Sequence, residues 1–134
     1  MLFDDAYLMN RGIYIYLNSV MAMIHMDELS MTNFKSTVFK ALGDPSRLKI
    51  LDLLRKGERC ACEIVPAVGF SQPTVSRHLK VLLDCGILRR RKEGNKVIYS
   101  VTSRTIYELM DSVNSTLVES LSRTIITRIQ HGYR

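Results

Sequence analysis

A pair of capped helical segments, separated by a short apolar element, most constrains what this chain can fold into. Asp44 followed by Pro45 predicts a helix start, because an aspartate side chain caps free backbone amides and proline loses no hydrogen bond at the first helical position. Ser71 predicts the start of a second helix, which runs to about Asp84 before a glycine stops it. A short element over residues 60–68 lies between them. This order is typical of a helix-turn-helix.

A strand-turn-strand pattern follows the second helix. Residues 87–101 form two short segments around Gly94-Asn95, a dipeptide typical of a hairpin turn. The predicted fold class is therefore mainly α with a small β-hairpin, a winged helix-turn-helix domain over residues 31–102.

The hairpin region is strongly basic. Residues 86–104 carry six cations against the single anion Glu93, a local net charge of +5, which is most of the net charge of +6 on the whole chain. A basic hairpin suits DNA phosphates or the minor groove, although lysine and arginine also protect an exposed strand edge from aggregation. The candidate DNA-contacting residues here are Arg89, Arg90, Arg91, Lys92 and Lys96.

The second helix of such a unit enters the major groove with its first residues at the base edges. Its exposed positions here are short or polar, whereas an ordinary surface helix more often carries Glu and Lys. Gln can pair with adenine and Arg with guanine, and hydroxyl groups can serve bases or phosphates. The chain is therefore predicted to bind double-stranded DNA, through Ser71, Gln72, Thr74, Ser76, Arg77, His78 and Lys80.

Two further segments flank the predicted DNA-binding domain. Residues 1–30 form an apolar extension, which we expect to be helical. Residues 103–134 are predicted to form one long helix, opened by a capping box of Thr105 and Glu108. An apolar stripe runs along this helix and comprises Ile106, Leu109, Val113, Leu117, Leu121, Ile125 and Ile129.

The number and spacing of the three cysteines indicate the redox state of the cellular compartment. An odd number, with two of them two residues apart, does not form a disulfide framework, so we expect reduced thiols in a cytoplasmic protein. Residues 13–24 are apolar but too short to span a bilayer, and no membrane partner is expected.

Two stretches carry a family resemblance. Residues 41–51 (ALGDPSRLKIL) and 71–82 (SQPTVSRHLKVL) closely resemble the opening helix and the recognition helix of the ArsR/SmtB family of metal-sensing repressors. The resemblance spans roughly residues 34–101. It implies a homodimer built on the first and last helices, repression of a nearby operon at its operator DNA, and release of DNA when an inducer binds.

The Cys60-Ala61-Cys62 segment resembles the metal box of that family, in which a Cys-x-Cys pair binds a soft ion. Thiolates favour arsenite, antimonite, Cd(II), Pb(II) or Zn(II). A third protein ligand is unknown, because Val65 stands where a third cysteine often follows and residues 1–59 contain none. Cys85 fits a small buried residue better than a ligand. No obligatory cofactor is expected.

The spacing of the thiols suggests a mechanism for release. On a regular helix of about 3.6 residues per turn, positions i and i+2 point about 200° apart, whereas in an extended segment they lie on one side. Capture of one ion by both sulfurs would therefore distort the start of a helix there. The hypothesis is that this strain moves the recognition helix out of register with its half-site.

Other interpretations of the thiols stay open. The pair could sense oxidation, or sense nothing and be buried core thiols. A thiol oxidoreductase is least favoured, because the common redox spacing is C-x-x-C in a βαβ context, so an enzyme is not expected. A zinc site on the last helix is also disfavoured, since Asp111 and Glu119 there suit solvated surface positions.

Overall fold

The computed structural model describes residues 28–132, so the predicted extension over residues 1–30 lies almost wholly outside the described residues. The chain divides into two compact units, Met1–Lys40 and Ala41–Arg134. The described part of the first unit is helix α2, Glu28–Leu42, whose last two residues belong to the second unit. No helix among residues 28–132 is both long enough and apolar enough to cross a membrane.

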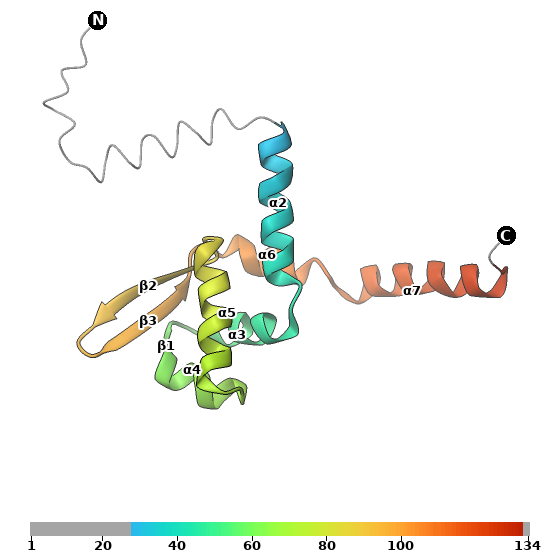
Figure 1. Ribbon diagram of the computed structural model, residues 1–134. Helices are drawn as coiled ribbons and strands as arrows, with labels where there is room; N and C mark the ends of the chain where they lie inside the picture. The colour runs from blue at the N-terminus through green and yellow to red at the C-terminus, as the bar shows by residue number, and fades with distance from the viewer. Residues whose placement is uncertain (1–27, 133–134) are drawn as a thin grey trace, which may run out of the picture. The chain divides into compact units, whose positions relative to one another are not determined.

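The second unit has the order predicted for a winged helix-turn-helix (Figure 1). Helix α3, Pro45–Arg55, is followed by strand β1, Arg59–Cys60, and helix α4, Ala61–Val68. Helix α5, Gln72–Asp84, is the predicted recognition helix. The wing consists of strands β2, Leu88–Glu93, and β3, Lys96–Val101, and two helices close the chain, α6, Thr105–Asp111, and α7, Ser115–Gln130.

Local capping signals set the helix boundaries as the sequence predicts. The Asp44 carboxylate accepts hydrogen bonds from the amides of Ser46 and Arg47, at 2.9 and 3.0 Å. Ser71 Oγ accepts from the Thr74 amide at 3.4 Å. Gly69 ends α4 in the left-handed region, at φ 74°, which lets the chain turn directly into α5.

The wing belongs to a three-stranded antiparallel sheet in the order β1-β3-β2. Strand β2 pairs with β3 around the predicted turn. The short strand β1 was not predicted, and it pairs with the other side of β3, with Cys60 opposite Ile98. Because of this pairing, the segment that carries the thiols forms part of the same sheet as the wing.

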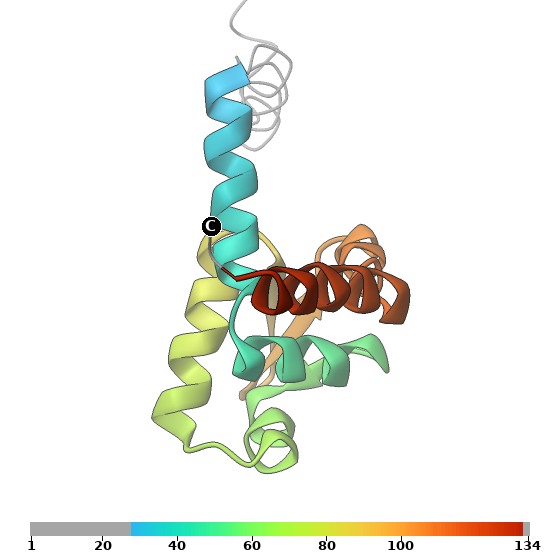
Figure 2. The ribbon, with the colours of Figure 1, turned by 90° about the vertical axis from the view of Figure 1, so that its right-hand side faces the viewer.

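Helices α3, α4 and α5 pack against one another (Figure 2). Their inward-facing side chains form one apolar core. Each helix buries one face, and the residues after α5 add two more apolar side chains. Burial of its apolar inner face holds α5 against the rest of the domain and leaves its outer face in solvent. The side chains of this core include Ile50, Leu51, Leu54, Ile64, Val68, Val75, Leu79, Leu82, Ile87 and Leu88.

The C-terminal segment differs from the prediction of one long helix. It forms α6 and α7, separated at residues 112–114. Asn114 has extended backbone and its Oδ1 accepts a hydrogen bond from the Leu117 amide at 3.1 Å, so it caps a new helix. The predicted capping box is also wrong. Ser103, not Thr105, supplies a hydroxyl at the start of α6.

A charged contact ties α6 to α3. Arg55 donates to both carboxylate oxygens of Asp111, at 2.7 and 2.8 Å, and its guanidinium lies over the ring of Tyr107. Asp111 therefore serves as the ion-pair partner of an arginine.

Candidate nucleic-acid interface and thiol pair

The outer face of α5 is polar and open to solvent. The inner face of α5 carries Val75, Leu79 and Leu82, which are buried in the core. Most residues on the opposite face of the helix are therefore exposed. Thr74 is half-buried, and its hydroxyl lies 2.8 Å from that of Ser71 at the helix cap. The predicted DNA-contacting residues that lie exposed on this face are Ser71, Gln72, Ser76, Arg77 and Lys80.

His78 lies apart from this exposed set. Its side chain is only 17% exposed, and Nδ1 is 3.9 Å from the carboxylate of Asp44. The hydrogen bond from the Arg47 amide and the positive charge of Arg47 lower the pKa of Asp44 below its ordinary value. His78 therefore packs α5 against the cap of α3, a role that its position in the recognition helix did not reveal.

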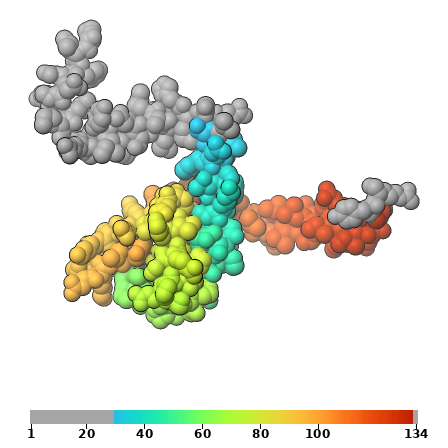
Figure 3. All heavy atoms as spheres, viewed as in Figure 1, coloured from blue at the N-terminus to red at the C-terminus, as the bar shows by residue number. Residues whose placement is uncertain are grey.

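An open groove of about 510 Å³ lies between α5 and the wing. The two elements are neighbours on one face of the molecule (Figure 3). Lys80, which lines the groove, forms an ion pair with Asp84 one turn further along the same helix, at 2.7 Å. The groove therefore brings cations of the helix and of the hairpin close together, and its lining residues are Ala61, Ser76, Leu79, Lys80, Leu83, Asp84, Arg90 and Tyr99.

The five predicted wing cations are all exposed, but they differ in their partners. Arg89 donates to the Ser100 hydroxyl at 3.1 Å, and Arg90 faces the groove. Arg91 forms a two-pronged pair with Glu58. This hydrogen bonding lowers the pKa of Glu58 and raises that of Arg91, so both stay charged.

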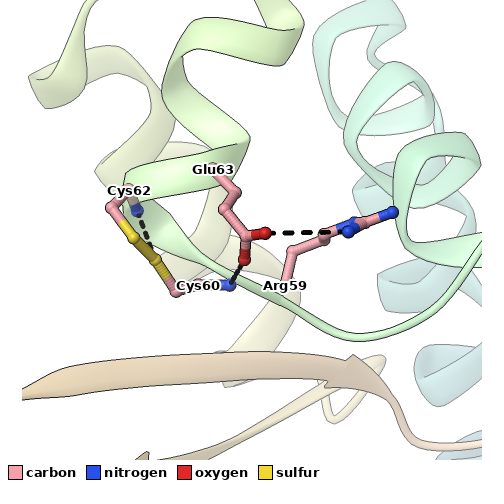
Figure 4. The surroundings of a disulfide bond; sticks show 4 residues. All are labelled: Arg59, Cys60, Cys62 and Glu63. Atoms are coloured by element: carbon pink, nitrogen blue, oxygen red, sulfur yellow. Dashed lines mark hydrogen bonds and ion pairs between the residues drawn. A yellow bond between two sulfur atoms is a disulfide. The ribbon is translucent and has the colours of Figure 1, made fainter.

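The two thiols of the Cys-x-Cys segment lie together at the start of α4 (Figure 4). Cys60 is the N-cap residue, with extended backbone at φ −79° and ψ 157°. Its sulfur accepts a hydrogen bond from the Cys62 amide at 3.0 Å, and the sulfurs are joined as a disulfide. Cys60 is buried at 2% exposure, whereas Cys62 is exposed.

This geometry corrects two expectations. The thiols were expected to be reduced, and the structure pairs them. The sulfurs were expected to diverge on a regular helix, but Cys60 precedes the helix, and its extended backbone turns both side chains to one side. Bringing the sulfurs together therefore needs no unwinding of α4.

Neighbouring residues form hydrogen bonds at the start of α4. The Glu63 carboxylate accepts from the Cys60 amide at 2.9 Å and lies 3.6 Å from Arg59, so it completes a capping box (Figure 4). Within residues 28–132, no cluster of three or more His, Cys, Asp or Glu side chains is placed to hold a metal ion. In reduced form the pair offers two thiolates, which fits a soft ion whose remaining ligands come from elsewhere.

Comparisons with known proteins place these features in a family. The family model "bacterial regulatory protein, arsR family" matches residues 44–90. The arsenical resistance operon repressor of Staphylococcus xylosus is 48% identical over 82 residues, which cover 61% of this chain and 75% of the repressor. A probable mercury resistance operon repressor of Streptomyces lividans is 46% identical over 72 residues, 54% of this chain and 58% of that protein.

The fold agrees with these sequence matches. A homodimeric winged helix-turn-helix DNA-binding domain from Mycobacterium bovis, described as a possible ArsR-family transcriptional regulator, is similar with a TM-score of 0.59. It is 27% identical, and the match covers 82% of this chain and 96% of that one.

Proposed function

Because the chain belongs to the arsR family of bacterial regulatory proteins, we propose that it is a homodimeric repressor whose α5 helices read operator DNA and whose thiols control release. The observation that carries the proposal is the exposed polar face of α5, held by a buried apolar face beside a basic hairpin. This arrangement presents hydrogen-bonding side chains to a groove while the core keeps the helix from shifting.

The exposed residues divide into two roles by their chemistry. Gln72 and Arg77 carry the side chains that pair best with base edges, adenine and guanine respectively. The hydroxyls of Ser71 and Ser76 and the wing cations suit phosphates, which position the protein without reading sequence. Lys80 and Arg90 line the groove between α5 and the wing, where both can reach one DNA strand.

An exposed apolar row on α7 supports the dimer. Leu117, Leu121, Ile125 and Ile129 recur every four residues, so they lie on one face, and each is between 40% and 71% exposed. A row of large apolar side chains in solvent marks an interaction surface. A second copy of this chain is the proposed occupant, since the similar domain from Mycobacterium bovis is described as homodimeric.

The proposed inducer is a thiophilic metal or metalloid of the arsenite, Cd, Pb or Zn class. Cys60 and Cys62 are placed side by side, and relatives are named as repressors of arsenical and mercury resistance operons. The bound ion would draw both thiols into one ligand set as thiolates. Since α4 need not unwind, the effect must travel from Cys60 through its pairing with β3 or through α4 to α5.

Oxidation of the same pair is a second candidate signal, because the structure joins the two sulfurs. A peroxide would take two electrons and two protons from the dithiol, leaving the disulfide and water. The disulfide withholds both thiolates from an ion, so the two signals exclude each other on one protomer.

A DNA-binding assay tests the proposed function. The reduced full chain should bind a duplex from upstream of its own gene more tightly than a scrambled duplex, with affinity that falls steeply as salt rises. Arg77→Ala should weaken specific binding, whereas Arg123→Ala on α7 is the matched control and should not. Equal affinity of the wild type for both duplexes at physiological salt would refute the proposal.

A further inference from the structure

A contact between the wing and the thiol segment (residues 58–63) has no role in the function proposed above. Glu58 Oε1 accepts from Arg91 Nη2 at 2.6 Å, and its second oxygen accepts from Nη1 of the same guanidinium. Arg91 makes one further hydrogen bond, to Glu93, at 3.1 Å. Arg91 is thus held by two carboxylates, although it was predicted to be a DNA-contacting cation.

The sheet register places this contact beside the thiols. Cys60 on β1 lies opposite Ile98 on β3, and Ile98 lies opposite Arg91 on β2. The three residues therefore form one row across the sheet. Glu58 precedes Cys60 by two residues and reaches over β3 to the far strand, so a shift of Cys60 is carried to Glu58 along a short extended segment.

We propose that Glu58 competes with DNA phosphate for Arg91, so that the thiol segment controls one of the wing's contacts with the operator. This inference rests on the proposed function. Glu58 then has a regulatory role. Four of the five wing cations are always available to DNA, whereas Arg91 is available only when Glu58 releases it.

The exposure of the pair makes such an exchange feasible. The side chains of Arg91 and Glu58 are 51% and 48% exposed. Ion pairs exposed to this extent are weak and screened by salt, so a phosphate at the same place can displace the carboxylate. The planar guanidinium fork fits carboxylate and phosphate equally well, which lets one side chain serve both partners.

The Glu58–Arg91 contact is seen together with one state of the thiol pair. The two sulfurs are joined and Glu58 holds Arg91 in the same state. In the proposed control, a closed thiol pair, whether bridged by an ion or oxidised, leaves the wing without one phosphate contact. Opening the pair frees the segment and lets Arg91 turn to the DNA.

The test is Glu58→Gln, measured with the full chain after oxidation of the Cys60–Cys62 pair, by fluorescence anisotropy on upstream duplex over a range of salt. One additional phosphate contact steepens the dependence of log affinity on log salt by about 0.9, so affinity should fall about 3.5-fold further between about 50 and 200 mM salt. In the Arg91→Ala background the same substitution should change nothing. Glu93→Gln removes the same charge from the wing but only one hydrogen bond, and is the matched control.

A second readout concerns release. With Cd(II) as the probe on the reduced chain, Glu58→Gln should lose less operator affinity than the wild type does. An unchanged salt slope in Glu58→Gln, or an equal change in the Arg91→Ala background, would overturn the inference while operator binding by the wild type upholds the proposed function. A slope change that Glu93→Gln reproduces in full would also overturn it, since net charge alone would then explain the effect.

Discussion

Truncation of Leu121 on α7 tests whether the exposed apolar row holds two copies of the chain together. Leu121 lies in the middle of the row and is 56% exposed, with Leu117 and Ile125 one turn away on either side. Leu121→Ala removes most of the apolar side chain but keeps helix propensity, because alanine is the best helix former. The substitution therefore changes the surface of α7 and leaves the helix intact.

The expected magnitude follows from this exposure. Full burial of a leucine side chain contributes about 1.5–3 kcal/mol. Because Leu121 has 56% of its surface still to bury, each copy gains roughly 1 kcal/mol in a dimer. A two-fold interface contains the position twice, so the variant should lose about 2 kcal/mol, which raises the dimer dissociation constant about 30-fold.

Sedimentation velocity over a concentration series measures this constant. Glu119→Ala is the matched control, since Glu119 faces away from the row and pairs with Arg123 on the same helix. The control should shift the constant by less than about 3-fold, as expected for loss of an exposed i,i+4 pair. An unchanged constant for Leu121→Ala, or a wild type that is monomeric at micromolar concentration, would refute the assignment of α7 to the dimer.

Three further results are expected. Asp44→Ala should lower the free energy of unfolding by about 1 kcal/mol at neutral pH because it removes the cap of α3, whereas Asp44→Asn, which still caps, should lose less in the same urea titration. Since the pKa of Asp44 is lowered in the folded state, its contribution is present above pH 4 or so and is lost as the pH falls through that lowered pKa; the deficit of Asp44→Ala should therefore shrink in acid, and a constant deficit would contradict this. Leu82→Ala should cost about 2–5 kcal/mol in thermal or chemical unfolding because Leu82 is fully buried, and a smaller loss would show that α5 is not held by this core.

The DNA-binding fold could be predicted because its signals are local. Asp44, Ser71 and Gly94 each act within a few residues of themselves, through a cap or a turn, and the structure confirms all three. The amphipathic pattern of α5 is likewise contained within a single helix, so it can be recognised without knowledge of distant contacts. The recognition helix was therefore predicted to within one residue at its start.

The features that were missed depend on residues far apart or on weak caps. Glu58 and Arg91 are 33 residues apart, and their contact follows from the pairing of β1 with β3. Strand β1 has only two residues, so the sequence pattern gave no signal that predicted this pairing. Cysteine is not among the usual N-cap residues, so the position of Cys60 was also missed. At Asn114 a capping residue was present, but the apolar period continued across it and favoured one helix.

Release of operator DNA by a thiophilic ion tests the central claim most directly. The measurement is fluorescence anisotropy of the upstream duplex with the reduced full chain, titrated with arsenite and with Cd(II), for the wild type and for the Cys60→Ser/Cys62→Ser double variant. Serine is a good N-cap, so the variant should keep α4 and bind DNA as the wild type does. The account predicts that the ion releases the wild type, by about 5- to 150-fold in affinity, and leaves the double variant bound. Equal release of both proteins would contradict the account, as would a wild type that neither ion can release.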